Sequence, residues 1–366
     1  PFLEYGFSQL GDLAVQQVGY VPLTSSAKQE MLLRLTGPEI NCGPDGDISI
    51  AGSSTVLPLA EAWAEVYDNS CPGISITVEG GGSSSGAGRV CDNSEKGTPV
   101  DIGDMSRDWK GSERNVQANG FVMECLKGDT SRKAAQFIVA FDGLSVVMKK
   151  GGAADVCVNT HLGGLTVNQL HWMFTAETDL AYTPANDDGD AVKEWSDLSA
   201  DCGAAEIVLA YPDADSGTYE YFFEEVLDEA AAGFRTGTQS SDDNVLVNTI
   251  TGDEAAIGYF GFAYYAENQA TLSAAPIVDN MTHGVADAPE EAVAPNANTV
   301  RDGSYSPLSR PLFMNVNNDK WEVVSSFLHW AFSGDGTAVI SEVGYVPLDD
   351  ATWQEMHRRI AAEGEY

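Results

Sequence analysis

Three short turns rich in serine, threonine and glycine are the parts of this sequence best suited to chemistry. They are Gly52–Val56, Gly82–Gly88 and Asp215–Thr218. Each follows a predicted strand and opens a predicted helix, where unpaired backbone N–H groups and the helix dipole favour an anion. Serine and threonine add hydroxyl donors, and glycine lets the backbone come close to a ligand. The three turns together predict a site for a small oxyanion, with ordinary helix N-capping as the competing explanation.

Two arginines could add a guanidinium to such a site. Arg107 ends a fourth hydroxyl-containing turn, Asp101–Arg107, and Arg235 lies in Gly233–Gly237. A guanidinium can form a two-pronged hydrogen-bonded pair with an oxyanion, which a single lysine ammonium cannot do. Either arginine could equally pair with a surface carboxylate, the commoner fate of this residue.

Strands followed directly by helices must position these turns. Apolar or alternating runs predict strands at 47–52, 74–79, 100–103, 206–211 and 257–262. Helix-like patterns with suitable caps occur at 59–67, 167–174, 218–227 and 263–270. The alternation predicts an α/β protein with mainly parallel sheets.

The composition excludes several classes of protein. The chain has 366 residues, of which 19 are Lys or Arg and 55 are Asp or Glu, so its formal charge is −36. Such an excess of acid argues against nucleic-acid binding and against docking on an anionic membrane. The hydrophobic fraction of 43% excludes a disordered acidic chain. No run of 18 apolar residues occurs, so membrane insertion is not expected.

The six cysteines indicate the compartment. They form no CxxC pair and no histidine lies at ligand spacing, so neither a metal site nor a cofactor is expected. An even number of scattered cysteines fits three disulfides in an oxidising compartment. Six buried free thiols are the alternative.

The two ends of the chain carry the same sequence pattern. Residues 2–35 align without gaps on residues 327–360, with Val18–Leu23 matching Val343–Leu348. We therefore expect 1–36 to repeat the C-terminal tail of a preceding unit in a tandem array with a repeat of about 325 residues. A helix pair duplicated within one protein is the alternative. An array of this kind would suit a surface or filament-forming structural protein.

Two other chemistries have weaker support. Gly82–Gly86 fits the GxSxG pattern of a hydrolase nucleophile, but a Ser/Gly-rich run matches it easily and none of the five histidines has a catalytic context. Asp45–Asp47 and Asp187–Asp190 resemble fragments of calcium loops. Neither completes a twelve-residue loop with its final Glu.

The body of the chain, 45–362, resembles the phosphate-binding proteins of bacterial ABC uptake systems (PstS-type), in a cyanobacterial-like branch. The matching motifs run in order along this span and cover 52–58, 80–88, 101–107, 139–147, 215–222, 242–247, 257–265 and 344–348. The resemblance implies a two-lobed type 2 periplasmic-binding-protein fold with a hinge. It places 37–140 and 268–366 in lobe 1 and 141–267 in lobe 2. It also implies an extracytoplasmic solute-binding protein that is not an enzyme.

The resemblance carries the ligand set over residue by residue. Donors from lobe 1 would be Ser54, Thr55, the Val56 amide, Ser84, Ser85 and Ser106, and donors from lobe 2 would be Ser216, Gly217 and Thr218. Many relatives have an arginine at the place of Pro212, so Arg107 or Arg235 would have to supply the guanidinium here. Ser106 stands where some relatives have a carboxylate that accepts the ligand's proton. Asp104 or Asp215 could substitute for it.

The resemblance also implies partners and one disulfide. Phosphate is the expected ligand, with a membrane permease or further copies of the chain as protein partners. Cys91 and Cys125 stand where this branch tends to pair two cysteines. Proximity along the chain then pairs Cys42 with Cys71 and Cys157 with Cys202.

Overall fold

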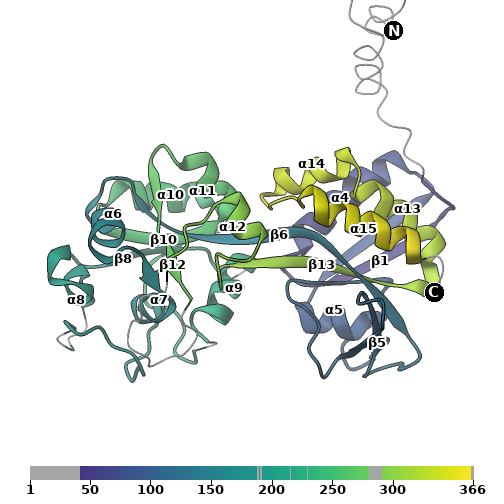
Figure 1. The fold of residues 1–366 in the computed structure, drawn as a ribbon, viewed down its shortest axis with the longest axis horizontal. Helices are drawn as coiled ribbons and strands as arrows, with labels where there is room; N and C mark the ends of the chain where they lie inside the picture. The colour runs from purple at the N-terminus through teal and green to yellow at the C-terminus, as the bar shows by residue number, and fades with distance from the viewer. Residues whose placement is uncertain are drawn as a thin grey trace, which may run out of the picture.

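Two lobes side by side, joined by extended strands, make up the molecule (Figure 1). The computed structural model describes residues 42–187, 189, 192–214, 216–228, 230–279 and 291–363. The repeated N-terminal segment, 1–36, lies outside the described residues. Among the described helices, none has the length and apolar character needed to cross a bilayer.

The first lobe is built from strand–helix units. In chain order its elements are β1 (Gly46–Gly52), α4 (Leu57–Ser70), β2 (Ile74–Gly80), α5 (Ser83–Val90), β3 (Ile102–Met105), β4 (Arg114–Val116) and β5 (Val122–Cys125). β1 pairs in parallel with both β2 and β3. Parallel strands end at the same edge of a sheet, so the turns after β1, β2 and β3 meet there.

Two long strands connect the lobes. β6 (Lys133–Lys149) pairs antiparallel with β13 (Ser309–Asn317) in the first lobe and with β10 (Ala256–Gly261) in the second. The change of partner falls between Gly143 and Leu144. Val346 adds a third contact at this crossing, because its backbone exchanges two hydrogen bonds with Phe141. The lobes therefore share one continuous sheet, with the order β2-β1-β3-β13-β6-β10-β8-β9.

The second lobe surrounds the far end of this sheet. Its helices are α6 (Ala153–Val156), α7 (Val167–Phe174), α8 (Trp195–Leu198), α9 (Gly217–Glu225), α10 (Asp243–Gly252), α11 (Phe262–Asn268) and α12 (Ala297–Arg301). Its further strands are β7 (Leu165–Thr166), β8 (Val208–Tyr211), β9 (Thr238–Gln239), β11 (Leu272–Ala274) and β12 (Ile277–Val278). β8 pairs in parallel with β10 and β9, so each lobe contains parallel pairs. The pairs β4–β5, β5–β6, β11–β6 and β13–β3 are antiparallel, as are those along the connecting strands, so the sheet is mixed and not mainly parallel as predicted.

The return to the first lobe occurs later than the sequence suggested. Ile277, Val300 and Leu308 belong to the second core, and β11 pairs with the second-lobe half of β6. The described residues 272–279 and 291–308 thus pack with the second lobe, not with the first lobe as the boundary at 267/268 expected. The apolar strand β13 makes the return. The helices α13 (Trp321–Ala331), α14 (Gly334–Val343) and α15 (Asp350–Glu363) then complete the first core.

Candidate anion-binding site between the lobes

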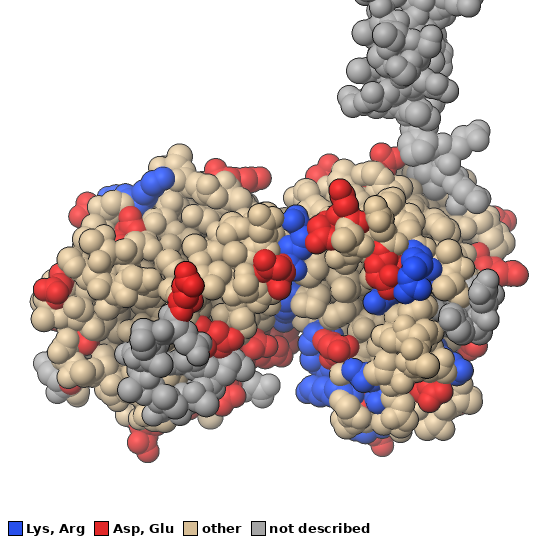
Figure 2. Space-filling view, viewed as in Figure 1, with Lys and Arg blue, Asp and Glu red and all other residues tan. Residues whose placement is uncertain are grey.

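A cavity of about 450 Å³ lies between the lobes, at the edge of the sheet where β1, β2 and β3 end. The first lobe lines it with Ser53, Gly81, Gly82, Ser83, Ser84, Ser106, Arg107 and Lys110. The second lobe lines it with Glu220, Glu224 and Glu225 of α9, and β13 adds Arg310. Lys and Arg gather along the first-lobe side of the groove, with acidic side chains opposite (Figure 2).

Three serine hydroxyls from three different turns meet on the first-lobe wall. Ser53 donates to the Ser106 hydroxyl over 2.9 Å, and the Ser83 and Ser106 hydroxyl oxygens are 3.2 Å apart. The Ser106 amide also donates to the Ser83 hydroxyl, over 3.1 Å. Ser53 and Ser106 are buried. The arrangement offers a converging set of neutral donors without any lysine.

Arg310 supplies the guanidinium of the cavity. Its Nε lies 3.3 Å from the carboxylate of Asp142, its partner across β6 and β13, and its Nη2 donates to the Thr55 hydroxyl over 2.7 Å. The guanidinium also stacks on Tyr221, 3.5 Å from the ring centroid. Burial raises the pKa of Asp142, and the nearby Arg310 charge opposes that rise. Three contacts thus fix Arg310, while its Nη1 group makes no hydrogen bond within the described residues.

The residues predicted from the first turn lie just behind the cavity wall. Ser54 donates to the Glu220 carboxylate across the lobes, and Thr55 accepts from Arg310. The Val56 amide donates to the Ser53 carbonyl within the turn, 3.1 Å away. Ser54 and Thr55 therefore contact residues that line the cavity, whereas the Val56 amide already has a partner.

The turns after β2 and β3 bring Ser84, Ser106 and Arg107 to the cavity. Arg107 donates to the Ser84 hydroxyl over 2.9 Å and makes a bidentate pair with Glu113, both distances being 3.0 Å. Burial alone would raise the pKa of Glu113, but hydrogen bonds from Arg107 and the Lys110 amide hold it below its ordinary value. Ser85 is half-buried in α5 and does not line the cavity.

Two predicted contributions from the second lobe are placed differently. Ser216 caps α9 by accepting from the Thr218 amide over 3.2 Å, and Gly217 packs so closely on Thr55 that a Cβ would lie 2.9 Å from the Thr55 Cα. Neither these residues nor Arg235 line the cavity. Arg235 donates to the Ile207 carbonyl inside the second lobe, over 2.6 Å. The glutamates one and two turns further along α9 face the cavity instead.

Asp104 is an unusual group beneath the site. It is fully buried, and neither carboxylate oxygen has a hydrogen-bond partner among the residues that the structure describes. The glycine at 52 makes room for it, since a Cβ there would lie 2.3 Å from Oδ1. Burial raises the pKa of Asp104 to about 8. The carboxyl group is therefore mostly protonated at neutral pH.

Comparison with known proteins assigns the fold and its family. A PBP superfamily domain matches residues 38–335. SphX of Synechococcus elongatus is 33% identical over 307 residues, which are 82% of this chain and 77% of that protein. The chain belongs to the PBP superfamily.

Further relatives place this PBP-superfamily chain with SphX and PstS proteins. The phosphate-binding protein PstS of Staphylococcus saprophyticus is 26% identical over 85% of its length. A crystal structure of a possible phosphate-binding protein from Planctomyces limnophilus has a TM-score of 0.68 and 29% identity, covering 87% of this chain and 99% of that one. PstS of Borrelia burgdorferi shares the fold at a TM-score of 0.54. The family consists of solute-binding proteins, not enzymes.

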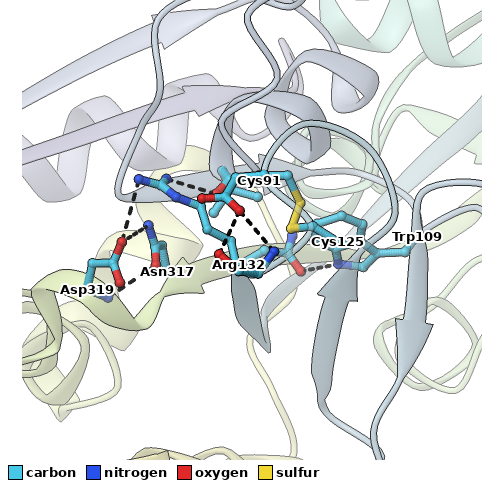
Figure 3. Close-up of a disulfide and its surroundings, with 10 residues drawn as sticks. Cys91, Trp109, Cys125, Arg132, Asn317 and Asp319 are labelled. Atoms are coloured by element: carbon cyan, nitrogen blue, oxygen red, sulfur yellow. Dashed lines mark hydrogen bonds and ion pairs between the residues drawn. A yellow bond between two sulfur atoms is a disulfide. The ribbon is translucent and has the colours of Figure 1, made fainter.

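Three disulfides brace this PBP-superfamily fold, as the sequence predicted: Cys42–Cys71, Cys91–Cys125 and Cys157–Cys202. The second joins the end of α5 to the end of β5, beside Trp109 and the Arg132–Asp319 ion pair (Figure 3). Among the described residues, no three His, Cys, Asp or Glu side chains are grouped as a metal ion would require. Of the two acidic runs, Asp188 and Asp190 lie outside the described residues.

Sequence reasoning missed Arg310, Ser53 and Ser83. Arg310 stands at the start of an apolar strand, where an arginine opposite the buried Asp142 is a signal of an internal ion pair. Ser53 and Ser83 lie inside the predicted turns, next to the predicted residues Ser54 and Ser84, and line the cavity themselves. The three α9 glutamates carried no sequence signal of their own, because acid is abundant throughout the chain.

Proposed function

We propose that this protein binds inorganic phosphate in the cavity between its lobes. The observation that carries the proposal is Arg310, held by Asp142, Thr55 and Tyr221 with one N–H group unused, beside three converging serine hydroxyls. Fixed hydrogen-bond donors hold an anion well in a cavity from which water is largely excluded. The names of the PstS relatives and of the possible phosphate-binding protein from Planctomyces limnophilus support phosphate as the anion.

The ligand residues we propose are Arg310, Ser53, Ser83, Ser106 and Ser84, with Arg107 at the mouth. Each of them lines the cavity. In this proposal Ser216–Thr218 do not bind the ligand. They cap α9 and pack it against the first turn. Ser54 and Thr55 act through Glu220 and Arg310.

The acidic face of α9 favours phosphate over sulfate. At neutral pH phosphate still carries a proton and sulfate does not, so only phosphate can donate a hydrogen bond to a carboxylate. We assign the acceptor role to Glu225, whose pKa is raised by burial and held down by the nearby charge of Arg310. Glu220, on the same helix, is exposed and already accepts from the Ser54 hydroxyl. A sulfate oxygen facing these carboxylates would gain no hydrogen bond and would meet like charge.

We further propose an extracytoplasmic protein that hands phosphate to a membrane permease of the ABC type. Three disulfides fit an oxidising compartment. The Vibrio cholerae protein with the same fold, at a TM-score of 0.53, is described as an ABC-type phosphate transport receptor.

Calorimetric titration tests the ligand. Phosphate and arsenate should each bind with one ion per chain, and sulfate should bind at least about tenfold more weakly, because an unmade buried hydrogen bond costs about 1–3 kcal/mol. Selenate, a proton-free ion like sulfate, is the matched control. Absence of heat with phosphate, or equal affinity for sulfate, would overturn the proposal.

A further inference from the structure

A second pocket opens beside the cavity and is lined by three lysines. It has a volume of about 270 Å³, and Ser84 and Lys110 line both it and the interlobe cavity. Lys96 and Lys127 line the second pocket only, together with Asn93 and Ser112. Lys96, Lys110 and Lys127 are exposed to solvent. We call this the lysine pocket.

Three lysines without an ionic partner among the described residues gather in the lysine pocket. None of its three ammonium groups makes a hydrogen bond or ion pair within the described residues, although the chain carries a formal charge of −36. By contrast, Lys149, Lys193 and Lys320 each hydrogen-bond to an acceptor. The one carboxylate that lines the pocket, Glu113, is already held by Arg107. The Lys110 charge lies near Glu113, but three lysines against this single lining carboxylate leave a local excess of positive charge in the pocket.

The Cys91–Cys125 disulfide builds the pocket by joining its two loops (Figure 3). The loop after Cys91 carries Lys96, whose aliphatic stem packs on α5 so closely that a Cβ on Gly88 would lie 2.5 Å from the Lys96 Cγ. The loop after Cys125 carries Lys127, and the Asp129 amide in that loop donates to the Cys91 carbonyl over 2.8 Å. The disulfide and this hydrogen bond therefore fix the positions of the two loops, and of the backbones of Lys96 and Lys127, relative to each other.

We propose that the lysine pocket is a second, weaker oxyanion site, which captures phosphate from solution and loads it into the adjoining cavity. The proposal rests on phosphate being the ligand of the cavity. A phosphate ion approaching this protein meets net repulsion, which a local basic pocket at the entrance relieves. Because the two spaces share Ser84 and Lys110, an ion can pass between them while keeping a lysine contact.

Association kinetics tests the loading role. The double variant K96Q/K127Q should slow phosphate association on the order of fivefold at low ionic strength, an effect that fades in high salt, with little change in the dissociation rate. K149Q/K150Q is the matched control, because it removes the same charge from the second lobe far from both cavities. Stopped-flow fluorescence of the intrinsic tryptophans measures both rates. Equal slowing in the two variants would show that only total charge matters and would overturn the proposal.

Lysine acetylation tests the pocket independently of the cavity. In an Arg310→Gln variant, millimolar phosphate should still protect Lys96 and Lys127 from acetic anhydride, as read by mass spectrometry, whereas Lys150 should remain reactive. Loss of phosphate binding in calorimetry with this protection intact separates failure of the cavity from failure of the pocket. Acetylation of Lys96 and Lys127 that phosphate does not change, in wild type and variant alike, would overturn the second site.

Discussion

The two walls of the interlobe cavity use similar sequence for opposite purposes. On the first-lobe wall, α5 begins with serines, of which Ser83 and Ser84 face the cavity. On the second-lobe wall, α9 also begins after a serine, but Ser216 caps its own helix and Glu220 and Glu224 face the cavity. A Ser/Gly turn before a helix therefore marks a helix start reliably and a ligand contact only when the turn faces the cavity.

The two walls differ in the hydrogen-bonding groups that they offer to an anion. The first wall and Arg310 offer donors and positive charge, while the second wall offers acceptors. Under the proposed function, the donors determine how tightly an oxyanion binds and the acceptors determine which oxyanion it is. The net charge of −36 bears on neither, because a few fixed dipoles at short range outweigh distant charges screened by salt. The predictions below alter one wall at a time.

Loss of Arg310 should have the largest effect. Arg310→Gln should weaken phosphate binding about a hundredfold, equivalent to about 3 kcal/mol, because a charge-assisted donor is lost and Asp142 is left without its counter-ion. Calorimetry measures the affinity. Arg235→Gln is the control, since Arg235 lies outside the cavity and should leave affinity within about twofold.

Because Arg310→Gln can also destabilise the fold, a second variant accompanies it. Arg310→Gln with Asp142→Asn removes both buried charges and should recover stability in urea unfolding without recovering binding. Recovered binding in the double variant would mean that the arginine acts only by neutralising Asp142. The donor wall would then consist of hydroxyls alone.

Asp104 lies behind the first wall and should make stability depend on pH. Its pKa is about 8 in the folded chain against 3.8 as the ordinary value, so its contribution to stability is fully present below about pH 4 and is lost as the pH rises through about 8. Asp104→Asn lacks this loss. The unfolding free energy of the variant minus that of wild type should therefore rise by at least about 2 kcal/mol between pH 5 and pH 8.5 in urea titrations.

The carboxyl group of Asp243, in the second lobe, provides a comparison for Asp104. Burial raises the pKa of Asp243, but only to about 6. Asp243→Asn should shift stability in the same direction over a window that closes near pH 6, with little further change above it. If the unfolding free energies of Asp104→Asn and Asp243→Asn depended on pH in the same way, the change between pH 6 and pH 8 could not be assigned to Asp104.

Much of this molecule follows from local sequence. The strand–turn–helix starts at Gly52, Gly82 and Ser216 lie where caps and glycines predicted them, because backbone N–H groups at a helix start need local partners. The three disulfides agree with the prediction, in which the family resemblance paired Cys91 with Cys125 and proximity along the chain then paired the other four cysteines. The resemblance of the motifs to a known family predicted the two-lobed fold.

Contacts between residues that are distant in the sequence could not be predicted. Arg310 reaches Thr55 across 255 positions of chain, and only the register of β13 on β6 places it there. The predicted lobe boundary at 267/268 was wrong for the same reason, because only tertiary packing shows that Ile277 and Val300 belong to the second core. The direction in which α9 turns its glutamates is likewise set by packing, not by composition.

Two serines test the asymmetry of the walls directly. Ser106→Ala removes a hydroxyl shared with Ser53 and Ser83, so phosphate affinity should fall about tenfold, or about 1–2 kcal/mol. Ser216→Ala removes the α9 cap and should lower the unfolding free energy by about 1 kcal/mol while leaving affinity within about twofold. A tenfold affinity loss in Ser216→Ala would restore the second-lobe turn as a ligand contact.

The smallest effect should come from the acidic wall and have the opposite sign. Ser54 donates to the Glu220 carboxylate, which therefore competes with an incoming anion for a donor and repels it. Glu220→Gln should strengthen phosphate binding about threefold, or about 0.6 kcal/mol, because an amide neither repels the ligand nor holds the hydroxyl as firmly. Glu61→Gln, an exposed change of the same charge on α4, should leave affinity unchanged and so corrects for net charge. If Glu220→Gln weakens phosphate binding while sulfate binding improves, this carboxylate accepts the ligand's proton and belongs to the site itself. If both variants strengthen binding equally, the second wall acts only through its total charge, and the comparison between the walls reduces to electrostatics.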